Sequence, residues 1–139
     1  MEDEDWINAK RELEVTARRY FKNEDSYERA LINQLYGQFY ALQRDYKNAT
    51  PWFEKAIAKG RLPFAADLQV TYSLAQCYFQ TGRYQDVIKT LENYRNKAEK
   101  RGQNMAPIQL MLLGIAYYQE QDILNAYANI CLLYTSDAA

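Results

Sequence analysis

Residues 45–57 read DYKNATPWFEKAI and combine a turn residue with a stripe of small and large apolar side chains. Asp45 is one of the residue types that cap helix N-termini. Ala49, Phe53 and Ala56 follow at spacings of four and three residues, which place them on one face of an α-helix. The stretch therefore predicts a helix that begins at a turn and packs this face against a neighbour.

The residues just before this stretch predict the neighbour. Gly37 is followed three residues later by Tyr40, so both lie on one helix face. We expect Gly37 to let the partner helix approach closely and Tyr40 to fill the core beside it. Residues 43–45 between the two patterns are enough for a short turn, so the two helices should form an antiparallel hairpin.

The same arrangement of a small residue, an aromatic residue, a turn and a second apolar stripe occurs twice more. The copies are spaced 38 and 39 residues apart, and Gly82 fits a left-handed turn position in the second. A self-similar pattern of this kind indicates a stack of similar helical hairpins. The matching positions are Ala75, Tyr78, Tyr84, Val87, Leu91 and Tyr94 in the second copy, and Gly114, Tyr117, Ile123, Ala126 and Ile130 in the third.

This pattern resembles the signature of the tetratricopeptide-repeat (TPR) family, and residues 45–57 agree with it closely. The resemblance implies an all-α fold in which about seven helices form antiparallel hairpins stacked as a right-handed α-solenoid. A HEAT-type repeat is the alternative with a longer period, but it would not place a turn between the two apolar patterns. The usual TPR period is about 34 residues, and we expect the surplus in the inter-repeat loops around residues 60–63 and 101–104.

Helical periodicity and caps predict the bounds of each element. Residues 1–25 should hold one helix, which is either the second helix of an incomplete repeat or a capping helix. We expect TPR 1 at 26–62, TPR 2 at 63–103 and a truncated TPR 3 at 104–130. The predicted helices are 5–22, 26–43, 46–59, 65–80, 84–101, 106–120 and one that begins near 123.

Residues 131–139, CLLYTSDAA, break the amphipathic pattern. They resemble the translation of a transposase-type sequencing-library adapter, while the ordinary alternative is a helix end with a loose tail. We interpret them as a non-native tail and expect the natural protein to continue beyond Asn129 or Ile130. Under this interpretation Met1 need not be the natural start.

The amino-acid composition of the chain argues against several classes of function. The net charge of -1 with no basic stripe argues against nucleic-acid binding, and no apolar run reaches membrane-spanning length. The chain has no histidine, and its two cysteines lack metal or redox spacing. We therefore expect no catalytic residues, no cofactor, no metal site and no direct membrane insertion.

In TPR arrays the first helix of each hairpin lines a concave groove, so the resemblance implies a partner-binding surface. Amides, rings and a thioether there suit an extended or helical peptide. Chaperone-binding TPR domains instead carry lysine and asparagine at these positions to hold a C-terminal carboxylate, and this chain lacks them. Met111 and Ile115 fit packing against a further repeat equally well. The groove positions, counted from the three small residues, are Gln34, Gln38, Ala41, Tyr72, Gln76, Phe79, Met111, Ile115 and Tyr118.

A narrower resemblance concerns residues 26–37 and 71–88, which are similar to periplasmic TPR proteins associated with TonB energy-transduction systems in Gram-negative bacteria. It implies a scaffold accessory to TonB-linked transport, TonB-system components as partners, and a signal peptide upstream of this sequence. The alternative is a cytoplasmic TPR adaptor or regulatory domain of a larger signalling protein. An enzyme that carries an appended array is a third class.

Overall fold

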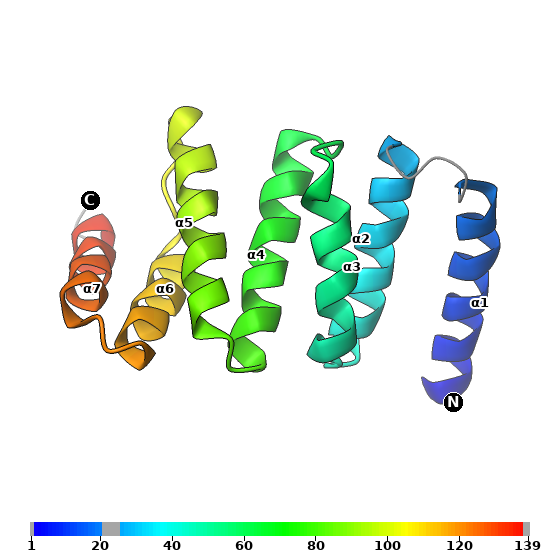
Figure 1. Cartoon of the computed structure of the whole chain (residues 1–139), viewed down its shortest axis with the longest axis horizontal. Helices are drawn as coiled ribbons and strands as arrows, with labels where there is room; N and C mark the ends of the chain where they lie inside the picture. The colour runs from blue at the N-terminus through cyan, green and yellow to red at the C-terminus, as the bar shows by residue number, and fades with distance from the viewer. Residues whose placement is uncertain (1, 21–25, 138–139) are drawn as a thin grey trace. The chain divides into compact units, whose positions relative to one another are not determined.

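The computed structural model describes residues 2–20 and 26–137, and within these ranges it contains α-helices and no strand (Figure 1). This confirms the predicted all-α fold. Six helices begin and end within one residue of the expected bounds where those were given, and α1 begins three residues early. Its predicted end at residue 22 lies outside the described ranges. The helices are α1 (Glu2–Tyr20), α2 (Tyr27–Leu42), α3 (Tyr46–Ala58), α4 (Phe64–Gln80), α5 (Tyr84–Lys100), α6 (Pro107–Gln119) and α7 (Ile123–Asp137).

The chain divides into two compact units, Met1–Val70 and Thr71–Ala139. The division falls inside α4, so this helix contributes its first part to one unit and its second part to the other. The expected repeat boundaries lie elsewhere, between the hairpins, and stay predictions.

In the first unit, α2 and α3 form a tightly packed hairpin. Gly37 is buried, and a Cβ atom built there would lie only 2.5 Å from Cδ1 and 2.6 Å from Cε1 of Phe53. Phe53 is 1% exposed, between Ala49 at 0% and Ala56 at 1%. The Phe53 ring thus packs directly on the α2 backbone at residue 37, where only glycine leaves room for it.

The N-terminal helix shares this core. Ala17 of α1 is 1% exposed and clusters with Ile32 and Tyr36 of α2. The Tyr36 ring stacks on that of Trp52, with 4.3 Å between centroids. The packing of α1 on the hairpin is what both an incomplete repeat and a capping helix would produce.

The second unit contains the hairpin of α6 and α7. A Cβ atom on Gly114 would lie 3.2 Å from Cγ1 of Ile130 and 3.5 Å from the carbonyl oxygen of Ala126. The close approach predicted from the glycine is therefore present, but it is looser than at Gly37. The neighbouring helices follow the same pattern, because Ala75 of α4 and Leu91 of α5 are both fully buried.

One expectation about the long period needs correction. The second copy does not place its surplus residues only in the loop at 101–104. Helix α5 has 17 residues where the equivalent α3 has 13, so about one extra helical turn precedes that loop. Ala98, which lies in this added turn, is 1% exposed, and the burial of its side chain explains why the helix continues.

The three hairpin turns close with the same hydrogen bonds. The N–H groups of Asp45, Arg83 and Asp122 donate to the carbonyl oxygens of Tyr40, Tyr78 and Tyr117 at 2.8–2.9 Å. This six-to-one bond, paired with a five-to-two bond, is the Schellman motif, which requires a left-handed residue after the helix. The carbonyl of each signature tyrosine thus fixes the turn that follows it.

The left-handed position is filled differently in the three turns. Gly82 has φ +76°, as predicted, whereas Arg44 and Gln121 adopt φ 61° and 64°. Asp45 and Asp122 then accept hydrogen bonds from the backbone N–H groups three residues on, which confirms the N-cap predicted at Asp45 and shows the same cap at Asp122. Two turns therefore carry a non-glycine residue in a conformation that favours glycine.

We expect Arg44→Gly and Gln121→Gly each to raise the free energy of unfolding by about 0.5–1 kcal/mol, because the left-handed conformation costs an L-residue about 1–2 kcal/mol and glycine offsets part of that gain through its unfolded-state entropy. Urea denaturation measures the change. Gln43→Gly is the matched control, since Gln43 has φ -86° and should gain nothing. A loss of stability in both variants would contradict the turn geometry.

Candidate binding surface

The first unit holds three of the predicted groove residues, all on α2. Gln34 is 8% exposed, and its Oε1 atom has no hydrogen-bond partner among the described residues. Gln38 and Ala41 are half-buried. In this unit Gln38 therefore offers the more accessible amide, while the Gln34 side chain is enclosed.

The second unit holds the other six predicted groove residues, three on α4 and three on α6. On α4, Gln76 is exposed, while Tyr72 and Phe79 are half-buried. On α6, Met111 is 42% and Tyr118 is 64% exposed, and Ile115 is half-buried. Large side chains that the core does not enclose occupy the predicted positions, and their role in binding a partner stays a prediction.

One of these side chains is held by a ring contact within the second unit. The Phe79 ring meets the Tyr84 ring of α5 edge-on, with 5.6 Å between centroids. Burial, and then the neighbouring Tyr94, raises the pKa of Tyr72. Phe79 thus packs against α5.

Helix α7 exposes further apolar side chains that the groove count did not include. Leu124 is 85%, Tyr127 is 70% and Ile123 is 57% exposed. The sequence signal was available, since apolar residues surround this helix on more than one face. Exposed apolar surface of this kind often marks a contact with another protein surface.

The second unit also contains a polar network that sequence reasoning missed. The Tyr117 hydroxyl donates to Oε1 of Glu92 at 2.9 Å, and Nη1 of Arg95 lies 3.5 Å from the same oxygen. Arg95 also donates to Oδ1 of Asn129, a residue only 3% exposed, and to the sulfur of Met105. Tyr117, which occupies the position that matches Tyr40, links α6 to α5, and Arg95 links α5 to α7.

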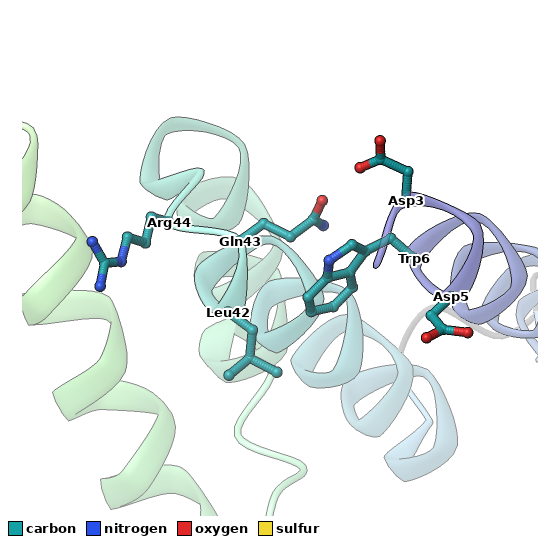
Figure 2. A pocket seen from close by; sticks show the side chains of 6 residues that line it. All are labelled: Asp3, Asp5, Trp6, Leu42, Gln43 and Arg44. Atoms are coloured by element: carbon teal, nitrogen blue, oxygen red, sulfur yellow. The ribbon is translucent and has the colours of Figure 1, made fainter. Parts of the chain in front are cut away.

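A pocket of about 550 Å³ lies in the first unit between the start of α1 and the α2–α3 turn. Figure 2 shows the Trp6 indole beside Gln43, with Asp3 and Asp5 on either side of it and Arg44 directed away. The Trp6 ring also meets Phe39 edge-on at 5.4 Å. Carboxylates beside an indole can hold a cationic side chain, but the sequence spacing gave no sign of this pocket.

Within residues 2–20 and 26–137 no group of three or more acidic or cysteine side chains could hold a metal ion. None of the helices in these ranges is both long and apolar enough to cross a membrane.

The polar network predicts a pH effect. Burial, followed by the hydrogen bond to Glu92, raises the pKa of Tyr117 to about 12. The folded state therefore holds the phenol proton more tightly than the unfolded chain, whose tyrosines titrate near pH 10. The stabilisation is complete below pH 10 and is lost as the pH rises from about 10 to 12. We expect Tyr117→Phe to remove this loss.

The measurement is the urea midpoint between pH 8 and 12 for the wild type, Tyr117→Phe and the control Tyr118→Phe. The Tyr117→Phe curve should be flatter than the wild-type curve, and the Tyr118→Phe curve should follow the wild type. Parallel curves for wild type and Tyr117→Phe would show that the folded state does not raise the pKa of Tyr117.

Comparison with known proteins supports the repeat type. Residues 42–106 match the family model described as anaphase-promoting complex, cyclosome, subunit 3. That model describes a TPR-type repeat, and the matched region includes residues 45–57 and the second-copy turn. No curated protein and no solved structure matches the chain. The helical hairpins and this match together support a TPR-type repeat within an all-α chain.

Proposed function

We propose that this protein is a non-catalytic scaffold that binds a partner peptide or helix through the first helices of its hairpins. The observation that carries the proposal is the exposure of large apolar side chains, Met111 and Tyr118, at groove positions of the second unit. Repeats of the TPR type generally serve as binding scaffolds, which supports the proposal. The matched family description names a subunit of a complex, and this agrees with a role in assembly.

The chemistry of the second unit's groove positions indicates what the partner should offer. Gln76 can bond a peptide backbone, and Phe79, Met111 and Tyr118 can enclose apolar side chains. None of the six positions carries a charged residue. The partner should therefore be an amphipathic or apolar segment, and its affinity should depend little on salt.

The finer proposal is a scaffold accessory to TonB-linked transport, with TonB-system components as partners in the periplasm. It rests on the sequence similarity of residues 26–37 and 71–88. The alternative is a cytoplasmic TPR adaptor or regulatory domain. The flanking gene sequence separates them: an upstream secretion signal with adjacent TonB-system genes fits the first, and an adjacent kinase, cyclase or DNA-binding domain fits the second.

Selection of a phage-displayed library of random peptides on the full chain tests the binding role. We expect apolar or amphipathic peptides to be selected, and Met111→Ala and Tyr118→Ala each to weaken their affinity about tenfold, as loss of an aromatic or thioether anchor does at interface hot spots. Fluorescence anisotropy with a labelled selected peptide measures this effect at low and high salt.

Leu124→Ala is the matched control, because Leu124 is 85% exposed but lies on the second helix of the same hairpin. The Leu124→Ala variant should bind the selected peptides with the same affinity as the wild type. Selected peptides that lose affinity with Leu124→Ala and keep it with Tyr118→Ala would place the binding surface on α7 and contradict the proposal.

A further inference from the structure

A second, smaller cavity lies in the α2–α3 hairpin of the first unit. Its volume is about 170 Å³. Helix α2 contributes Arg29 and Asn33, which are four residues apart and therefore share a face, while Lys55 and Ala58 come from α3 and Lys59 caps it. The predicted groove residue Gln34 is one residue on from Asn33 and thus about 100° around the helix. The cavity is separate from the proposed peptide groove.

Asn33 lines this cavity with a buried polar side chain that lacks a hydrogen-bond partner for its oxygen among the described residues. The side chain is 5% exposed, and its Oδ1 atom has no hydrogen-bond partner in the described parts of the chain. Leaving a buried polar atom unpaired is energetically unfavourable, so such atoms are rare without a compensating role. The carboxamide can turn to present either its oxygen or its NH2 group to a bound molecule.

Among the described residues, three cationic side chains and no acidic one line the cavity. The helix dipole accounts for part of this, because lysines near the C-terminus of α3 complement it, and Lys55 also lies over the Trp52 ring at 4.9 Å. Arg29 lies in the first turn of α2, where a cation opposes the helix dipole. Opposite helix ends thus bring their cations to one small cavity.

The cavity's size limits what it can hold. At about 30 Å³ for each water molecule in the liquid, 170 Å³ corresponds to five or six waters. A phosphate group with the first atom of its ester fits this space, whereas a nucleotide or a helix does not. A phosphate monoester carries a charge of about -1.5 to -2 near pH 7, and cationic side chains attract this charge. The guanidinium of Arg29 can hold two of its oxygens at once.

We propose that this cavity binds the phosphate group of a phosphate monoester, with Arg29, Lys55 and Lys59 as its cationic partners and Asn33 as its neutral hydrogen-bond partner. The site is independent of the peptide groove, so a protein that binds no peptide could still bind phosphate here.

Titration of the isotope-labelled full chain with inorganic phosphate or phenyl phosphate, followed by amide chemical shifts at constant ionic strength, tests the proposal. Saturable shifts should centre on the amides of the lining residues. Comparable affinity for the two ligands indicates that free phosphate suffices, and tighter binding of phenyl phosphate indicates an ester. Either result supports the site. The absence of saturable shifts, or acetate binding as tight as phosphate, overturns it.

Three variants make the test specific. Lys55→Gln and Lys59→Gln should each weaken phosphate binding about tenfold, as expected for loss of a charge-assisted hydrogen bond. Lys47→Gln, which changes an exposed lysine of α3 outside the cavity, should leave the affinity unchanged. Equal weakening by Lys47→Gln and Lys55→Gln would show that phosphate responds only to net charge and would overturn the site.

Asn33→Leu separates a binding role from a structural one. Removing an unpaired buried polar group should leave the melting temperature equal or higher, while phosphate affinity should fall. Undiminished phosphate binding in Asn33→Leu would overturn the assignment of Asn33.

Discussion

The contact between the Phe53 ring and the α2 backbone at Gly37 is the constraint on which the rest of the first unit depends. A Cβ atom on residue 37 would lie 2.5 and 2.6 Å from two atoms of this ring, which is closer than side chains can approach. Because the helices approach this closely, Ala49 and Ala56 are sealed from solvent on either side of the ring. The small cavity that Asn33 lines is in the same α2–α3 hairpin.

The same logic explains what the sequence could predict. Close helix packing needs a small residue opposite a large one. The sequence shows this as a small residue followed three residues later by a tyrosine, and the pattern is present in all three copies. The turns leave a mark as well, because Asp45 and Asp122 cap the next helix. The left-handed conformations of Arg44 and Gln121 leave no such mark, since neither residue type favours them. The sequence therefore predicts the helix bounds accurately, but it does not predict the left-handed backbone conformation in two of the turns.

The site was harder to predict, because it depends on contacts between residues far apart in the sequence. Gln34 was expected at an open groove position but is buried, a result that helical counting on α2 alone could not give. The network from Tyr117 through Glu92 to Arg95 and Asn129 joins residues 25 and 34 positions apart. The exposed Met111 and Tyr118, in contrast, follow directly from their register on α6, and they carry the proposed scaffold role.

A double-mutant cycle of Gly37→Ala and Phe53→Leu tests the central contact most directly, with urea denaturation as the measurement. Gly37→Ala alone should destabilise the fold by about 1–3 kcal/mol because it overpacks the hairpin. Phe53→Leu should relieve much of that loss, giving a coupling energy of at least about 1 kcal/mol. If the two effects add within about 0.5 kcal/mol, or if Gly37→Ala stabilises the protein as helix propensity alone would predict, the helices do not approach at this point and the account is wrong.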